Sequence, residues 1–241
     1  MQDSYAGDVG DFGKFGLLRI LAAGGFKIGV NWYRTVDSPS NRIGDGRLIH
    51  YLKKDWPKKC DPCLTNSLLE IVESGRSIQA LEERHLIENA TYFSQPLCPA
   101  SCLEFSRSEW HRNAMRTLES TDIVFCDPDN GLIVPSAVSA SKKSDKYIFH
   151  YEIAEYYSSG KSVIFYNHRC RQKESAYLQR FQSLKNNSAF QMAAWFGISY
   201  RRGTVRDYIF ILQPTHADAV QKLLTKFYAG EWSKHFTKLD I

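Results

Sequence analysis

Short apolar segments alternate with longer amphipathic segments along most of the chain. Strands are predicted at residues 26–33, 90–93, 123–126, 162–166, 191–198 and 205–213. Helices are predicted at residues 12–23, 106–118, 147–157, 171–184 and 216–228 and over most of 48–83, with Trp232 and Phe236 in a C-terminal tail. This alternation predicts one Rossmann-like, three-layer α/β domain over residues 1–241, with a mostly parallel sheet and an antiparallel last strand.

The stretch around Asp127 joins an apolar strand to a sharp turn, Asp127-Pro128-Asp129-Asn130-Gly131. Proline removes a backbone donor and Asn-Gly tolerates positive φ, so the chain must turn there. Two carboxylates therefore stand at the carboxyl end of a buried strand, where open α/β sheets bind ligands. The same residues also suit an ordinary turn in which an aspartate caps the next element.

A second apolar strand, residues 162–166, ends in Asn167-His168-Arg169. Asp127, Asp129 and His168, together with Asp8 or Asp11, are therefore expected at one sheet edge. Carboxylates and imidazole in that arrangement suit Mg²⁺ or Mn²⁺, or a general base.

The N-terminal segment is rich in aspartate and glycine. Asp11 is expected to cap a helix that ends at Gly24-Gly25. The glycines before that helix either form a tight loop or leave backbone amides free to face an anion. No Walker loop occurs, and no G-x-G-x-x-G follows the first strand, which argues against a dinucleotide site. Arg34 is a candidate partner for an anionic ligand.

Two cysteine pairs and one His-x-Glu pair are candidate metal-binding motifs. Cys60 and Cys63 form a CxxC, and Cys98 and Cys102 a CxxxC, which predicts either one structural zinc site or unlinked thiols. His150-x-Glu152 lacks the downstream P-C-x-x-C of zinc deaminases, so that chemistry is rejected.

Composition narrows the class of protein only moderately. The chain is 43% hydrophobic and 24% charged, with a formal net charge of +5. A mildly basic chain permits a nucleic-acid partner without requiring one. No secretory signal and no apolar run of about 18 residues is present, so a cytoplasmic protein without a membrane partner is expected.

Two short motifs resemble a known family. Residues 5–15, read YAGDVGDFGKF, are similar to the H-A-G-N-x-A-D-x-x-K-H segment of bacterial ribosomal-RNA adenine-N6 methyltransferases, which are class I S-adenosylmethionine-dependent enzymes. The matches are Ala6, Gly7, Asp11 and Lys14, and Tyr5 replaces the histidine. Asp127-Pro128-Asp129-Asn130 aligns with the family's D-P-P-Y, although the second proline and the aromatic residue are absent.

The resemblance implies a set of functional residues. Asp127 would hold the target amine while Lys14 and Tyr5 close over the site, and Asp129 and His168 are further catalytic candidates. S-adenosylmethionine would lie near Tyr5, Gly7, Asp8, Asp11 and Arg34. Phosphates would contact Arg169, Arg171, Arg201 and Arg202. The family's acidic and glycine-rich cofactor loop is replaced here by residues 31–35, NWYRT.

Three hypotheses follow for the function. The first is adenine-N6 methyl transfer on nucleic acid. The second is a metal-dependent nuclease or phosphohydrolase that uses Asp8, Asp11, Asp127, Asp129 and His168. The third is a catalytically silent module that binds nucleic acid or a protein on the same scaffold.

Overall fold

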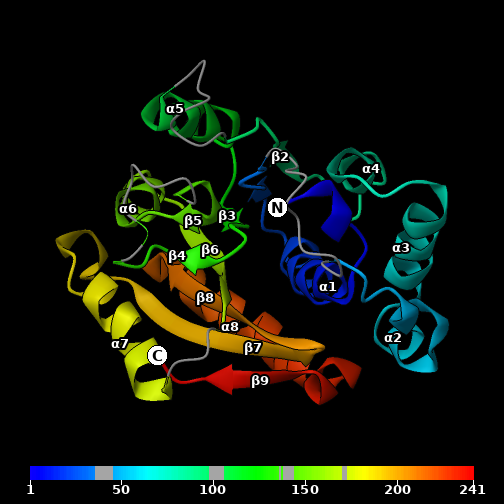
Figure 1. Ribbon diagram of the computed structural model, residues 1–241. Coiled ribbons are helices and arrows are strands. Elements are labelled where there is room, and N and C mark those ends of the chain that lie inside the picture. Colours follow the sequence, from blue (N-terminus) through cyan, green and yellow to red (C-terminus); the bar gives the residue numbers. More distant parts are fainter. Residues whose placement is uncertain (36–45, 98–105, 136, 138–143, 170–172) are drawn as a thin grey trace.

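Figure 1 shows a computed structural model of the chain, which describes residues 1–35, 46–97, 106–135, 137, 144–169 and 173–241. Within these residues the main sheet has seven strands. Their spatial order is β2 (Thr91–Phe93), β1 (Ile28–Asn31), β3 (Ile123–Cys126), β6 (Ser162–His168), β8 (Thr204–Leu212), β7 (Ala194–Arg202) and β9 (Phe236–Leu239).

The strands of this sheet run mostly in one direction. β2, β1, β3 and β6 pair in parallel. β8 is antiparallel to both β6 and β7, so β7 runs in the same direction as β6, whereas β9 is antiparallel to β7. The expected α/β architecture with a mostly parallel sheet is therefore confirmed, and it is consistent with a Rossmann-like fold.

Helices cover both faces of the sheet, which gives three layers (Figure 1). One face carries α1 (Val9–Ala23), α2 (Asp55–Cys60), α3 (Pro62–Ser74), α4 (Ile78–Glu83) and α8 (Pro214–Ala229). The other carries α5 (Arg107–Thr117), α6 (His150–Ser158) and α7 (Glu174–Lys185). Short 3₁₀ helices lie at Asp3–Tyr5, His50–Lys53, Ser144–Lys146, Ser188–Phe190 and Glu231–Lys234. Among the described residues, no helix is long and apolar enough to cross a membrane.

Strand β3 separates two apolar clusters because successive side chains point to opposite faces. Ile123 and Phe125 pack in the cluster beneath α1 and α8. Val124 and Cys126 pack in the cluster beneath α5, α6 and α7. All four residues are fully buried, as the apolar run predicts. The next residue, Asp127, leaves the strand at its carboxyl end, on the α1 side.

The predicted cap of α1 is wrong, because Asp8 rather than Asp11 occupies that position. Asp8 Oδ1 accepts hydrogen bonds from the backbone nitrogens of Gly10 at 2.7 Å and Asp11 at 3.1 Å. Asp8 has an extended backbone, so its carboxylate reaches the first free amides of the helix. Asp11 lies in the first helical turn, where its side chain is buried.

Two segments in the second half of the chain differ from the predicted secondary structure. Residues 147–157 divide into β5 (Tyr147–Ile148) and α6, and β5 pairs in parallel with β4 (Gly131–Leu132) in a separate two-stranded sheet. The C-terminal residues form β9 rather than a tail, and Phe236 is buried in the core. The four residues of β9, FTKL, include two polar residues, too weak a pattern to identify an edge strand.

Candidate functional site

Lys14 joins the two segments that carry the family resemblance. Its Nζ lies 2.7 Å from Asp11 Oδ1 and 2.6 Å from Asp127 Oδ2. All three side chains are buried, and the ammonium also lies 4.9 Å from the centre of the Trp32 ring. Burial alone would lower the pKa of Lys14, but Asp11 and Asp127 raise it above its ordinary value, so Lys14 stays charged.

The two carboxylates beside Lys14, those of Asp11 and Asp127, have different hydrogen-bond partners. Burial raises the pKa of both Asp11 and Asp127, and Lys14 opposes this effect. Asp11 is bonded through both oxygens, since its Oδ2 accepts from the backbone nitrogen of Gly7 at 2.9 Å. Asp127 Oδ2 accepts from Lys14, whereas Oδ1 accepts no hydrogen bond from a described residue. Within the described residues, Asp127 is therefore tied to Lys14 through one carboxylate oxygen alone.

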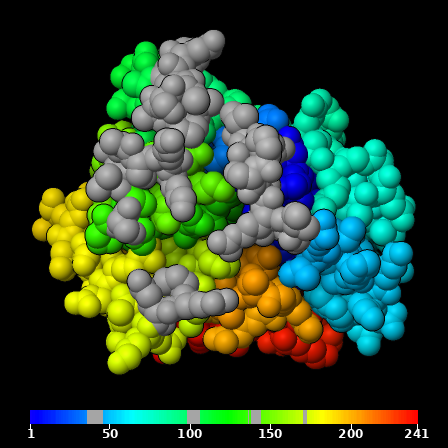
Figure 2. Space-filling view, in the orientation of Figure 1, coloured from blue at the N-terminus to red at the C-terminus, as the bar shows by residue number. Residues whose placement is uncertain are grey.

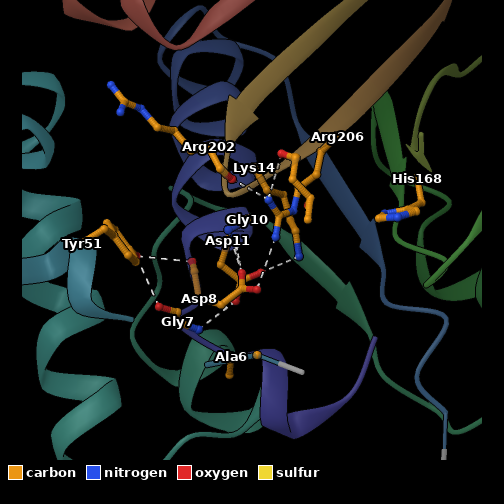
Figure 3. Close-up of polar contacts among 12 residues, drawn as sticks. Ala6, Gly7, Asp8, Gly10, Asp11, Lys14, Tyr51, His168, Arg202 and Arg206 are labelled. Atoms are coloured by element: carbon orange, nitrogen blue, oxygen red, sulfur yellow. Dashed lines mark hydrogen bonds and ion pairs between the residues drawn. The ribbon is translucent and has the colours of Figure 1, made fainter. Parts of the chain in front are cut away.

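The first turn of α1 is anchored from outside the helix (Figure 3). Tyr51 Oη donates to the carbonyl oxygens of Gly7 at 3.2 Å and Asp8 at 3.3 Å. Arg206 Nη2 lies 3.5 Å from Asp8 Oδ2. A Cβ on Gly10 would come within 2.4 Å of the Arg206 side chain, so this close approach requires glycine. The N-terminal glycine segment thus positions Asp8, Asp11 and Lys14.

Asp129, the second carboxylate of the turn, is directed to other partners. The α-amino group of Met1 lies 2.8 Å from its Oδ1, and Gln2 Nε2 donates to its Oδ2 at 3.2 Å. Lys146 lies 3.5 Å from Oδ2. Burial opposes ionisation of Asp129, but Met1 and Lys146 hold its pKa below the ordinary value. No contact joins Asp129 to Lys14 in the described residues.

The N-terminal residues lie at the edge of the sheet where a cofactor would be expected to bind. The strand order reverses between β1 and β3, the usual ligand position in an open α/β sheet. There the Met1 amino group donates to the carbonyl oxygens of Tyr33 at 2.9 Å and Asp127 at 3.4 Å. The backbone nitrogen of Thr35 donates to the Met1 carbonyl at 3.1 Å. Figure 2 shows dark-blue atoms from the N-terminal part of the chain next to cyan atoms at the right of the view.

The described residues at this edge of the sheet do not fit S-adenosylmethionine in this conformation. The residues after β1 include the bulky, buried Trp32 and Tyr33 instead of glycines. Arg34, an expected cofactor residue, pairs with Asp3 at 3.2 Å. Tyr5 is half-buried in the first 3₁₀ helix. Gly7, Asp8 and Asp11 serve the first turn of α1.

His168 ends β6 and does not contact the four aspartates in the described residues. Its Nδ1 lies 2.9 Å from Tyr166 Oη. Figure 3 shows His168 apart from Asp8 and Asp11, on the far side of Arg206. Within the described part of the chain, no group of three or more His, Cys, Asp or Glu residues could hold a metal ion. The convergence of His168 with the carboxylates remains a prediction.

Most of the arginines expected to meet phosphate already have protein partners. Arg169 Nε lies 2.9 Å from the buried Asp207. Arg202 donates to His235 Nδ1 at 2.8 Å and stacks on Trp56, with 4.5 Å between its guanidinium carbon and the ring centre. Arg201 is exposed and donates to Thr237 at 3.1 Å. Arg171 lies outside the described residues.

One of the two cysteine pairs lies within the described residues. Cys60 and Cys63 are free thiols, half-buried and exposed respectively, at the junction of α2 and α3. Burial raises the pKa of Cys60 to about 11. Cys98 and Cys102 lie outside the described residues, so the zinc hypothesis stays a prediction.

Glu152 of the His150-x-Glu152 motif forms a buried ion pair. Glu152 is fully buried, and Arg107 approaches it with Nε 2.6 Å from Oε1 and Nη2 3.0 Å from Oε2. Tyr33 Oη donates to the same carboxylate at 2.9 Å. Glu152 therefore holds together the ends of β1, α5 and α6.

Sequence reasoning missed three residues that shape this edge of the sheet, namely Tyr51, Tyr166 and Arg206. Tyr166 has a readable signal, since it stands two residues before His168 and a strand repeats every two residues. Tyr51 and Arg206 have none, because only the tertiary fold brings them to the first turn of α1.

Comparisons with known proteins give little further information. No protein-family model and no curated protein matches the sequence. A solved structure described as protein LPL1258 from Legionella pneumophila str. Philadelphia 1, with the family model DUF519, is similar over 98% of this chain and 96% of its own. The TM-score is 0.45 and the sequence identity is 9%, a likeness too weak to support an argument.

Proposed function

We propose that the protein binds nucleic acid and holds the exocyclic amine of an adenine base at Asp127. The observation that carries this proposal is that the two carboxylate oxygens of Asp127 have different partners. Asp127 Oδ2 is bound to Lys14 at 2.6 Å, whereas Oδ1 accepts no hydrogen bond from a described residue. An ionised carboxylate only accepts hydrogen bonds, so the partner of Oδ1 is a donor such as water or a base amine.

Three further features support the proposal. Lys14 favours the ionised form of Asp127, which is the better acceptor for an amine hydrogen. The net charge of +5 favours a polyanionic partner, and the exposed Arg201 is available near the β7–β8 turn for a phosphate. Adenine is the base that the resemblance to the adenine-N6 methyltransferases implies.

Replacing Asp127 tests this proposal. In Asp127→Ala, Lys14 keeps its bond to Asp11, so the fold should survive, while the amine loses its acceptor. We expect the affinity for a single-stranded, adenine-containing oligonucleotide to fall about tenfold or more, because hydrogen bonds to charged groups contribute about 1.5–3 kcal/mol. Fluorescence anisotropy at constant salt measures the affinity. Asp218→Ala, at an exposed position on α8, is the matched control and should bind as the wild type does. Wild-type affinity in Asp127→Ala would remove Asp127 from recognition.

Methyl transfer at the same amine is a second candidate function. It is favoured by the contact between the two motif segments, which lie 113 residues apart and meet through Lys14 and Asp127. Because Met1 is bonded to Tyr33 and Asp127 at the ends of β1 and β3, we expect S-adenosylmethionine to leave the melting temperature unchanged. A shift in that temperature, together with Asp127-dependent transfer of a labelled methyl group to RNA or DNA, would instead establish the enzyme.

Metal-dependent hydrolysis is a third candidate, favoured by Asp8 and Asp11 at the start of α1 and by Asp127, which meets Asp11 through Lys14. The charged Lys14 already lies between Asp11 and Asp127, where a cation would otherwise bind. We therefore expect Mg²⁺ and Mn²⁺ to change neither the melting temperature nor the integrity of a nucleic-acid probe. Metal-dependent cleavage of that probe would favour the hydrolase.

A further inference from the structure

Tyr166 and His168 form an aromatic pair at the carboxyl end of β6. A hydrogen bond of 2.9 Å joins Tyr166 Oη and His168 Nδ1, and the ring centres are 6.5 Å apart. Tyr166 is half-buried and packs against the buried Tyr208, with 6.3 Å between their ring centres. His168 is exposed. The half-buried Tyr166 thus fixes the position of the exposed His168 ring.

The register of the sheet places this pair beside Asp127. Cys126 of β3 pairs with Phe165 of β6, so Asp127 follows at the level of Tyr166. Ile164 belongs to the apolar cluster on the α1 face, and Tyr166 packs against that cluster. Because side chains two residues apart in a strand share a face, His168 also lies on the α1 face, one step further out. Asp127 reaches Lys14 of α1 on the same side.

The imidazole ring is neutral and has few partners. Partial desolvation of the ring against the sheet and the nearby Arg206 lower the pKa of His168, and Asp207 opposes them. His168 is therefore uncharged at pH 7. Nδ1 is paired with Tyr166, and no described residue bonds to Nε2 or forms an ion pair with the ring. Within the described residues, the ring therefore has no carboxylate partner for proton transfer and belongs to no metal-binding group.

We propose that His168 is the surface on which the base held at Asp127 stacks, with Tyr166 as its positioning residue. This inference rests on the proposed function and extends it to the face of the base. A hydrogen bond at Asp127 fixes only one edge of a base, whereas contact with a ring fixes its plane. The ligand class is an unpaired purine base in a single-stranded nucleic acid, since bases within a duplex have no free face.

The experiment compares ring-removing and ring-keeping substitutions at an exposed position. Affinities for a single-stranded oligonucleotide with one adenine among pyrimidines are measured by fluorescence anisotropy. His168→Leu should weaken binding about tenfold, because stacking of a base on an aromatic side chain contributes at this scale. His168→Phe should bind within about twofold of the wild type, since it keeps the ring. Thermal melting of each variant checks the fold.

The outcomes separate this inference from the proposed function. Equal affinities for His168→Leu and the wild type would overturn the stacking role. If Asp127→Ala still weakens binding in that case, only the stacking role is lost. A wild-type protein that does not bind the oligonucleotide would overturn the proposed function, and the stacking role with it. Weak binding by both His168→Leu and His168→Phe would show that the imidazole nitrogens act rather than the ring face.

Discussion

Lys14→Met is expected to lower the free energy of unfolding by about 3–5 kcal/mol, the usual cost of removing one partner from a buried ion pair. Asp11 and Asp127 would then face each other in a site where both are buried. Neither carboxylate would then have the ammonium that now pairs with both of them. Urea denaturation of the wild type and the variant at pH 7 measures this difference.

The exposed Lys58 provides the control for this prediction. Lys58→Met should change the free energy of unfolding by less than about 0.5 kcal/mol, because its ammonium remains in water in the folded state. Without Lys14, the folded-state pKa of Asp11 and Asp127 lies above the unfolded value, so protonation stabilises the fold. The Lys14→Met deficit should therefore shrink as the pH falls from 7 toward 5. A deficit below about 1 kcal/mol at pH 7 would contradict the assignment of Lys14 as the buried counter-ion.

Arg107→Leu should have an effect of similar size, about 3–5 kcal/mol, for the same reason. Glu152 is fully buried, and Arg107 also donates to the carbonyl oxygens of Ser144 at 2.8 Å and Tyr147 at 2.6 Å. Among the described residues, its loss would leave the buried carboxylate with only the Tyr33 hydroxyl, the Phe149 backbone nitrogen and Tyr151 as donors.

A matched control is available on the same helix. Arg112 is exposed on α5, and Arg112→Leu should shift the melting temperature by no more than a degree or two. Arg107→Lys should recover little, because an ammonium cannot reproduce the paired guanidinium contacts to Glu152. Equal melting temperatures for Arg107→Leu and Arg112→Leu would show that Glu152 is not held by Arg107.

The apolar runs made much of the sheet predictable from the sequence. Residues 123–126 are buried on both faces, so a continuous hydrophobic run identifies them as a central strand. The turn after Asp127 was equally readable from proline and Asn-Gly. β9 was not readable, because its two buried residues, Phe236 and Leu239, are three positions apart and face different apolar clusters, so the segment shows no alternating pattern.

The candidate site was predictable only in part. Asp8, Asp11, Lys14 and Asp127 could be singled out, and Lys14 does join Asp11 to Asp127. The partner of each carboxylate could not be predicted, since these pairings join segments far apart in the chain. Asp129 is an example. It stands only two residues after Asp127, which suggests a shared site. The turn instead directs the Asp129 side chain to Met1 and Gln2.

The most direct test of the account changes the base and leaves the protein intact. Wild-type affinity is measured for two single-stranded oligonucleotides that differ at one position, adenine in one and unsubstituted purine, which lacks the amine, in the other. Amine recognition at Asp127 predicts that the adenine oligonucleotide binds about tenfold tighter or more than the purine oligonucleotide, because only adenine has an amine that can donate to Asp127 Oδ1. Equal affinity for the two would contradict amine recognition at Asp127.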